Sequence, residues 1–389
     1  MQLSSKVKKL PKYLFAEIDE MKRKKIREGK KVIDLGVGDP DLPTPKHVVE
    51  AMKIAVEKVE RQKYPSYEGM LSFRVAASEF YRRRKGVKVD PEKEVIALIG
   101  SKEGIAHLPL AFVDNGEYVL VPDPGYPVYH ASTILAGGIP YHIPLKAENK
   151  FLPNFEEIPE EVTRKAKILF LNYPNNPTAA VIDKEKIKEA IDFCIEKKII
   201  LAHDAAYSEI TFDNYRAPSF LEFDNSFEVT IEFNSLSKTY NMTGWRIGFA
   251  CGNEEILRGL LKVKTNIDSG VFEAVQEAAI AALTGRDDVI EQNCRIFAER
   301  RKVFVEKLRE AGFEVEMPKA TFYVWCKVEM NSIEFVKLLL EKTGIIATPG
   351  IGFGEYGEGY VRFAMTRSIE VLREAAEKIL EFSKSLNKK

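Results

Sequence analysis

Two serines, a lysine and an arginine lie close together in the segment NSLSKTYNMTGWRIG, residues 234–248. A lysine that is removed from water loses its proton and can attack a carbonyl carbon. The same segment places Ser235 three positions before Lys238, which is the spacing of an acyl-enzyme serine and its lysine. A surface lysine whose stem covers the edge of a sheet would do neither. The segment alone leaves all three interpretations open.

Ser101 and Lys102 follow the apolar run VIALIG and precede a segment with helical periodicity. Ligands of open parallel sheets bind beyond the carboxyl ends of the strands, so residues at such positions are candidates for a site. The N–H groups at a helix N-terminus, together with the Ser101 hydroxyl, could hold a phosphate. A serine that only caps the helix is the alternative.

Asp204 follows the apolar run IILAH, Tyr207 lies three positions further on, and the loop NYPNNPT spans residues 172–178. A buried carboxylate needs a partner, and a structural salt bridge would be sufficient for Asp204. The loop could be an ordinary turn, or it could bring a side-chain amide into a site. Together with Lys238 and a phosphate cradle, these residue types indicate a phosphorylated carbonyl cofactor.

The elements that must position these residues are short apolar runs bounded by Gly, Pro, Asn or Asp. They are VIALIG, YVLVPDPG, ILFLNYPNNP, IILAHDAAY, VTIEFNS and RIGFACGN, and they are typical of buried strands. Segments with helical periodicity, such as GIAHLPLAFV and KEKIKEAIDFCIEKK, lie between them. This alternation predicts an α/β fold with a mostly parallel sheet flanked by helices.

A long charged amphipathic stretch, VIEQNCRIFAERRKVFVEKLREAG, follows TGRDD and predicts a helix that leaves one domain and enters another. We therefore expect a large domain over residues 45–289. The strands ATFYVWCKVEM, GIIATPG and GYVRFAMT and the helices SIEFVKLLLEK and SIEVLREAAEKILEFSKSL indicate a smaller α+β domain. It would comprise residues 290–389 together with an N-terminal arm, residues 1–44.

The composition excludes several classes of partner. Lys plus Arg equals Asp plus Glu at 58 each, so the chain lacks the basic field of a protein that binds nucleic acid or an anionic membrane. The four cysteines form no CxxC pair, and we expect neither disulfides nor a metal site. We find no signal-peptide pattern and no apolar run near the roughly 18 residues of a membrane helix. A cytoplasmic protein with small-molecule substrates is expected.

The chain resembles the fold-type I pyridoxal-phosphate aminotransferases along nearly its whole length. The motifs that carry the resemblance are GVGDPDLPTP, YPSYEG, GSKEG, DPGYPVY, NYPNNPT, DAAY, SLSKTYNMTGWRIG and YVRFA, in the family's order. It implies the fold of that family, with a large cofactor-binding domain and a smaller domain. It also implies pyridoxal 5'-phosphate as cofactor and an L-amino acid and a 2-oxo acid as substrates, used in a ping-pong reaction.

By this resemblance, Lys238 binds the cofactor as a Schiff base and, once released, moves a proton at the substrate Cα. Asp204 pairs with the ring nitrogen and keeps it protonated. Asn176 and Tyr207 hydrogen-bond the ring oxygen, and Tyr126 stacks on the ring; Lys238, Asp204 and Tyr207 form the expected catalytic set.

The resemblance also implies which residues bind the cofactor phosphate and the substrate. The expected phosphate ligands are Ser101, Lys102, Ser235, Ser237 and Arg246, with Tyr64 from a second subunit. Arg362, in YVRFAMT, clamps the substrate α-carboxylate, because a guanidinium fork matches carboxylate oxygens. Since Tyr64 comes from the neighbouring chain, the active unit is a homodimer with shared sites.

Several motifs are most similar to the LL-diaminopimelate aminotransferase branch: PKYLFAEI, GSKEG, DAAY, KATFYVW and GIGFGEYGEGYVR. The substrate would then be LL-diaminopimelate with 2-oxoglutarate, as in lysine biosynthesis. The expected substrate-binding residues are Arg362, Gly38, Tyr13, Asn176, Tyr126 and Asn266, with Glu68 of the other subunit for the distal ammonium. KVKTNIDSG contains no second arginine for a distal carboxylate, which weakens aspartate as substrate.

Three alternatives stay in competition with this interpretation. Aspartate or alanine aminotransferases of the same family share most of the motifs. A serine acyl-enzyme of the penicillin-binding type would use Ser235 with the K-T-G of residues 342–344, although the S-D-N element is missing. A non-catalytic homologue, such as the aminotransferase-like half of a transcription regulator, would carry an appended winged helix, and we find none.

Overall fold

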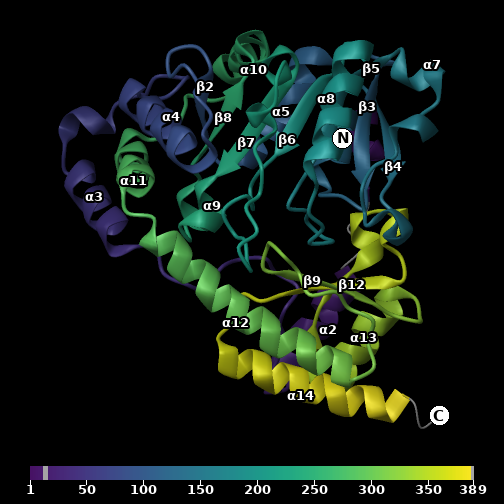
Figure 1. Ribbon diagram of the computed structural model, residues 1–389. Coiled ribbons are helices and arrows are strands. Elements are labelled where there is room, and N and C mark those ends of the chain that lie inside the picture. The colour runs from purple at the N-terminus through teal and green to yellow at the C-terminus, as the bar shows by residue number, and fades with distance from the viewer. Residues whose placement is uncertain (12–15, 387–389) are drawn as a thin grey trace.

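A computed structural model describes residues 1–11 and 16–386 of the chain. The chain forms two parts that face each other, a larger one around a seven-stranded sheet and a smaller one around a three-stranded sheet (Figure 1). The helix α12 (Asp288–Glu310) extends from the larger part along the smaller one, where it packs against α14 (Ile369–Leu386). The expected domain boundary at residue 289 falls in the first turn of α12, and the division into two domains stays a prediction.

The large sheet has the strand order β2-β8-β7-β6-β5-β3-β4. Its strands are β2 (Val95–Leu98), β3 (Tyr118–Asp123), β4 (Ile139–Pro144), β5 (Ala166–Leu171), β6 (Ile200–Asp204), β7 (Thr230–Ser235) and β8 (Gly248–Gly252). Only β8 runs antiparallel to its neighbours, so the predicted mostly parallel α/β sheet is confirmed. β4 was not among the predicted strands, because this edge strand has few buried residues and no continuous apolar run.

The inner strands are buried on both sides because helices cover both faces of the sheet. On β5, Ile168 and Phe170 pack on the face covered by α5 (Ser101–Phe112) and α10 (Glu254–Ile267). Leu169 and Leu171 pack on the opposite face, against α8 (Lys184–Lys197). Successive side chains of a strand point to opposite faces, so an apolar run of this kind predicts burial on both sides.

The smaller part is built from both ends of the chain. Its sheet has the order β11 (Thr348–Pro349), β12 (Tyr360–Ala364) and β9 (Tyr323–Lys327), all antiparallel. Beside it, β1 (Ile33–Asp34) pairs in parallel with β10 (Ile345–Ile346). The helix α2 (Ala16–Arg27) contacts α13 (Ser332–Thr343), whereas α1 (Ser5–Lys9) contacts α6 (Val128–Ala136) of the larger part. The N-terminal arm therefore touches both parts.

The remaining helices connect and cover these sheets. They are α3 (Lys46–Val56), α4 (Leu71–Lys85), α6 (Val128–Ala136), α7 (Glu160–Thr163), α9 (Leu236–Thr239) and α11 (Glu273–Thr284). Short 3-10 helices are η1 (Val59–Gln62), η2 (Ala147–Asn149), η3 (Phe155–Glu157), η4 (Phe220–Glu222), η5 (Ser226–Glu228), η6 (Thr243–Trp245), η7 (Gly350–Phe353) and η8 (Glu355–Gly357). Within the described residues, none of the helices has the length and apolar character needed to cross a membrane. The four cysteines form no disulfide.

Candidate active site

A cavity of about 290 Å³ lies at the carboxyl ends of β5, β6 and β7, where the small part faces the large sheet. It is lined by Gly38, Ser101, Lys102, Tyr126, Asn172, Asn176, Asp204, Ala206, Tyr207, Ser235, Ser237, Lys238, Arg246, Tyr323 and Arg362. Most of the residues that the sequence singled out therefore lie in one place. Asn172 and Tyr323 were not predicted, although both belong to quoted motifs, NYPNNPT and KATFYVW.

Lys238 projects into this cavity from α9, the short helix that follows β7. The hydroxyl of Ser235 begins α9 by accepting a hydrogen bond from the N–H of Ser237 at 3.2 Å. The ammonium group of Lys238 donates to the carbonyl oxygen of Gly38 at 2.9 Å. Burial lowers the pKa of Lys238 to about 8, with Asp39 opposing the shift and the charges of nearby arginines assisting it. With this pKa, roughly a tenth of the amine is unprotonated at pH 7, and an attack on a carbonyl requires this form.

Asp204 ends β6 with its carboxylate in the same cavity. The hydroxyl of Tyr129 donates to Oδ2 at 2.7 Å, and the N–H of Ala206 donates to Oδ1 at 3.3 Å. Burial raises the pKa of Asp204, while the Tyr129 hydrogen bond and the charge of His203 counteract it. Among the described residues, no lysine or arginine forms a salt bridge with Asp204, so the structural salt bridge considered above is absent. The carboxylate is placed to accept a hydrogen bond from a protonated nitrogen of a ligand.

Two asparagines of the 172–178 loop connect Asp204 to the small part. The side-chain amide of Asn172 donates to the backbone carbonyl of Asp204 at 2.7 Å, and its oxygen accepts the N–H of Asn176 at 2.8 Å. The side-chain oxygen of Asn176 in turn accepts a hydrogen bond from Nη1 of Arg362 at 2.6 Å. The loop is therefore an ordered part of the site.

Arg362 lies on β12 with its guanidinium almost completely buried. Nη2 donates to the carbonyl of Gly36 at 2.7 Å, and the ring centroids of Tyr323 and Phe353 lie 4.2 and 4.7 Å from its central carbon. Within the described part of the chain it forms no ion pair with a carboxylate, and its Nε has no hydrogen-bond partner. A buried cation without a counter-ion is suited to an anionic ligand, since burying it alone is unfavourable.

Tyr207 and Tyr323 meet across the two parts, with their hydroxyl oxygens 2.9 Å apart. Burial raises the pKa of Tyr207 well above its ordinary value, and the proximity of Tyr323 adds to this effect. The Tyr207 phenol therefore stays protonated and can donate. Gly38 lies against the same group: a Cβ at this position would lie 2.0 Å from the hydroxyl oxygen of Tyr323, which explains why glycine stands there.

The other end of the cavity is rich in hydrogen-bond donors. α5 begins at Ser101 after Gly100, and no side chain caps its first N–H groups. In the chain as described, neither Lys102 nor Arg246 pairs with a carboxylate, and Arg246 donates only to the carbonyl of Thr243. Gly100 has φ +74°, and a Cβ there would lie 2.3 Å from Nη2 of Arg246. Unpaired cations around a helix N-terminus form a site for a dianion such as a phosphate group.

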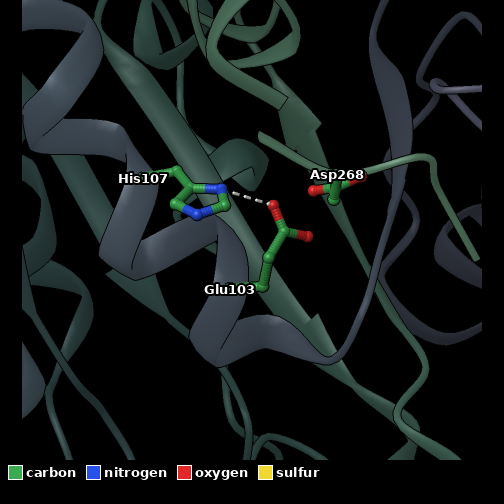
Figure 2. A group of neighbouring side chains, drawn as sticks. All are labelled: Glu103, His107 and Asp268. Atoms are coloured by element: carbon green, nitrogen blue, oxygen red, sulfur yellow. Dashed lines mark hydrogen bonds and ion pairs between the residues drawn. The ribbon is translucent and has the colours of Figure 1, made fainter. Parts of the chain in front are cut away.

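A network of charges holds the first turn of α5 in place (Figure 2). Glu103 accepts the N–H of Ile99 at 3.0 Å through one oxygen and lies 2.8 Å from Nδ1 of His107 through the other. Glu103, His107 and Asp268 are close enough together to be considered as metal ligands. The buried ammonium of Lys264 already bridges the two carboxylates, at 3.1 and 3.2 Å. We therefore interpret the group as an ion-pair network that fixes the anion-binding end of α5.

Three predicted site residues, all within the described part of the chain, do not line this cavity. Tyr64 is 90% exposed, and Glu68 pairs with Arg74 at 3.0 Å on the surface of the larger part. Asn266, expected in the substrate pocket, lies exposed in the last turn of α10, where its amide donates to the carbonyl of Lys262. Tyr13 lies outside the described residues.

The serine acyl-enzyme hypothesis has no structural basis here. The Ser235 hydroxyl caps α9, and the lysine of the K-T-G sequence, Lys342, is exposed near the end of α13. Lys342 faces α14 in a separate surface pocket, so it does not meet Ser235.

Comparisons with known proteins agree with this geometry. A family model described as aminotransferase class I and II matches residues 30–379. Among curated proteins, an LL-diaminopimelate aminotransferase of Aquifex aeolicus is 54% identical over 97% of this chain and 98% of its own. One of Halothermothrix orenii is 52% identical with the same coverage. Among solved structures, substrate-bound BacF from Bacillus subtilis is 39% identical, with a TM-score of 0.94 over 98% of both chains.

Proposed function

Because this chain belongs to the class I and II aminotransferases and is thus a transaminase, we propose that it moves an amino group between LL-diaminopimelate and 2-oxoglutarate. The observation that supports this substrate pair is the roughly 50% identity, over nearly the full chain, to several proteins named LL-diaminopimelate aminotransferase. The enzyme would serve lysine biosynthesis, and the reaction would alternate between donor and acceptor at one site.

Pyridoxal 5'-phosphate fits the three kinds of group that line the cavity. Unpaired cations and N–H groups near Ser101 suit its phosphate, the Asp204 carboxylate suits its ring nitrogen, and the depressed pKa of Lys238 suits its aldehyde. When bound, this cofactor supplies the carbonyl carbon and the electron-withdrawing ring that amino transfer needs.

The residues that line the cavity would then have the following roles. Lys238, as a free amine, would take the proton from the Cα of the amino donor and, in the second half-reaction, would give a proton to the Cα of the new amino acid, which a base with a pKa near the working pH does well. Asp204 accepts the ring N–H, while Asn176 and Tyr207 donate to the ring oxygen and Tyr126 covers the ring face. Ser101, Lys102, Ser235, Ser237 and Arg246 are the proposed phosphate ligands.

Arg362 would bind the α-carboxylate of both substrates. It needs no large rearrangement, because Asn176 and the rings of Tyr323 and Phe353 already fix the plane of its guanidinium. The other arginine that lines the cavity, Arg246, is at the phosphate end, so the cavity of one chain offers no second arginine for an aspartate side chain.

We propose a homodimer in which Tyr64 and Glu68 complete the partner's site. The segment around Tyr64 exposes large apolar side chains, as expected of a surface that another chain covers. They are Ile54, Val59, Tyr64, Tyr67 and Leu71, with exposed fractions between 45 and 90%. Asn266 and Tyr13 are the remaining candidates for contacts to the distal end of the substrate.

Half-reactions with single amino acids test the substrate. Purified enzyme loaded with cofactor is mixed with LL-diaminopimelate, L-glutamate, L-aspartate or L-alanine, and the visible absorption of its carbonyl form is followed. We expect fast loss of this absorption with the first two and at least about a hundredfold slower loss with the others. Fast loss with aspartate or alanine and none with LL-diaminopimelate would refute the substrate assignment.

Complementation tests the shared site. Lys238→Ala and Tyr64→Ala are each prepared as inactive protein, unfolded together in equal amounts and refolded. If Tyr64 acts across the interface, every mixed dimer has one intact site, and about a quarter of the original sites return. No recovery from a verified mixed dimer would place Tyr64 outside the partner's site.

A further inference from the structure

A second buried charge pair lies directly behind Asp204. His203 precedes Asp204 on β6, so its side chain points to the opposite face of the sheet. It is fully buried and pairs in register with Glu232 of β7, with Nδ1 2.6 Å from the carboxylate oxygen Oε1. The other ring nitrogen, Nε2, lies 2.9 Å from the backbone carbonyl of Tyr173. The hydroxyl of Ser219 donates to the second oxygen of Glu232.

These partners determine where the protons lie. A carbonyl oxygen only accepts hydrogen bonds, so Nε2 of His203 must bear a hydrogen. Burial opposes ionisation of Glu232, but its bonds to His203 and Ser219 hold its pKa below the ordinary value. A hydrogen must also lie between Nδ1 and Oε1, and when Glu232 is ionised it lies on Nδ1, which makes His203 an imidazolium ion. Phe220 covers the ring of His203 at a centroid distance of 3.8 Å and 12°.

His203 connects β6 to the 172–178 loop, and these two segments build the amino-acid site. His203 donates a hydrogen bond to the backbone carbonyl of Tyr173. The backbone carbonyl of the next strand residue, Asp204, accepts one from the side-chain amide of Asn172. Consecutive residues of β6 thus bind consecutive residues of the loop. The same loop continues to Asn176, which accepts the hydrogen bond from Arg362. A shift of the loop along β6 would move that acceptor away from the guanidinium.

We propose that His203 is a positioning residue of the transaminase, which holds the 172–178 loop in register with β6 and, through its positive charge, favours the ionised form of Asp204. The second part rests on the role proposed above for Asp204 as the partner of the cofactor ring nitrogen. Its physical basis is that burial raises the pKa of Asp204, and the charge of His203 is among the influences that lower it.

Other groups around the pair leave this assignment intact. Lys85 of α4 also lowers the pKa of Glu232, which further favours the carboxylate. Tyr81 and Cys251, which face Glu232 from α4 and β8, have pKa values raised well above the ordinary ones by burial, so both are neutral. On the far side of the sheet, Tyr129 and Lys238 face Asp204 itself.

Nitrogen NMR of histidine tests the charge directly and needs no activity. The chain has five histidines, so enzyme labelled with ¹⁵N-histidine gives few signals, and His203→Gln identifies those of His203. We expect protons on both ring nitrogens at about pH 7.5, where a free imidazole is mostly neutral. A single protonated nitrogen would overturn the assignment of the charge.

Glu232→Gln separates the charge from the loop contact. The glutamine amide can donate to Nδ1 and accept from Ser219, so His203 becomes neutral while Nε2 keeps its bond to Tyr173. We expect about tenfold weaker binding of pyridoxal phosphate, measured by equilibrium dialysis, with the donor KM changed by less than about threefold, since one pKa unit corresponds to a tenfold effect. Unchanged cofactor affinity would refute an effect of His203 on Asp204.

His203→Phe combined with Glu232→Leu removes the loop contact without leaving a buried charge unpaired. The ring volume and the stack on Phe220 are kept, so we expect folded protein whose donor KM rises at least about tenfold. An unchanged KM would refute the positioning of the loop. If the double variant does not fold, hydrogen exchange of the loop amides in Glu232→Gln gives a second test. The retained Tyr173 bond must keep these amides protected, so a loss of their protection would refute the positioning. His142→Gln is the matched control, since His142 pairs with a carboxylate, that of Asp123, away from the loop.

Asp204→Ala distinguishes this inference from the proposed function. If this variant binds the cofactor as well as the unmodified enzyme, the proposed role of Asp204 fails, and with it the effect of His203 on cofactor affinity. The protonation of His203 and its hold on the loop are measured by NMR and by donor KM, so they stand or fall separately.

Discussion

The hydroxyl of Tyr129 is a sensitive place to test how the buried carboxylate is kept charged. It donates to Oδ2 of Asp204 at 2.7 Å, and both groups are fully buried. Tyr129→Phe removes this donor alone, because the ring keeps its stack on Phe170 at 4.9 Å and leaves no sizeable cavity. A hydrogen bond to a charged group contributes about 1.5–3 kcal/mol. We therefore expect the affinity for pyridoxal phosphate to fall roughly tenfold to 150-fold.

The same change predicts a pH dependence of stability in the enzyme without cofactor. Burial raises the pKa of Asp204 in the folded protein. At pH values between the pKa of Asp204 in the unfolded chain and that in the folded protein, the folded protein therefore binds more protons. Stability then falls as pH rises through this window. Tyr129→Phe raises the folded value further, so the variant should lose about 1.5–3 kcal/mol near pH 7 and only the roughly 0.5–1.5 kcal/mol of a neutral hydrogen bond in acid.

Urea unfolding across pH and equilibrium dialysis of the cofactor measure these two effects. Tyr173→Phe is the matched control, because its buried hydroxyl donates to the neutral carbonyl of Phe151 at 2.6 Å. Its stability loss should not depend on pH. If Tyr129→Phe binds the cofactor normally and its stability loss is the same at all pH values, Asp204 does not depend on this bond for its charge, and our reasoning is wrong.

Three further predictions follow from single positions. The pKa of Lys238 is lowered to about 8, so above that pH the folded apoenzyme binds fewer protons than the unfolded chain. This group therefore makes the free energy of unfolding rise by up to about 3 kcal/mol between about pH 8 and 10.5. Lys238→Met should abolish the rise, and calorimetry that finds it unchanged would contradict the shift. Arg362→Lys should raise donor KM about a hundredfold in steady-state assays, because an ammonium cannot form the bidentate contact, and a change below fivefold would argue against the clamp. Gly100→Ala should weaken phosphate binding at least tenfold by fluorescence titration, since its Cβ would displace Arg246 and its φ is +74°; normal affinity would exclude Arg246 as a ligand.

The inner strands were predictable because burial on both faces leaves a run of apolar residues, as in ILFL, residues 168–171 of β5. The edge strand β4 shows the opposite case. Only Ile143 of this strand is buried, and a run that mixes Pro, Tyr and His with single apolar residues does not differ from a loop. Its place in the sheet depends on pairing with β3, which only the folded chain reveals.

The site was predictable where a residue type follows the end of a strand, as with Asp204 and Lys238. Partners that arrive from elsewhere were missed, because their sequence positions are unrelated to the contact. Tyr129 lies 75 residues from Asp204, and Tyr323 lies 116 residues from Tyr207. His203 was hidden for another reason: it lies on the far face of β6, where a polar residue inside an apolar run gives no sign of its partner.

The pairing of β1 with β10 has a consequence for how the enzyme is made. Gly36 and Gly38, near the start of the chain, contact Arg362 and Lys238, which are 326 and 200 positions away. During translation, residues 33–38 cannot form these contacts until residues 345–364 have left the ribosome. Nascent chains arrested before that point should bind phosphate through the large sheet yet fail to recognise an amino acid. Within one chain, binding of the substrate carboxylate by Arg362 therefore becomes possible only after both ends of the chain have come together.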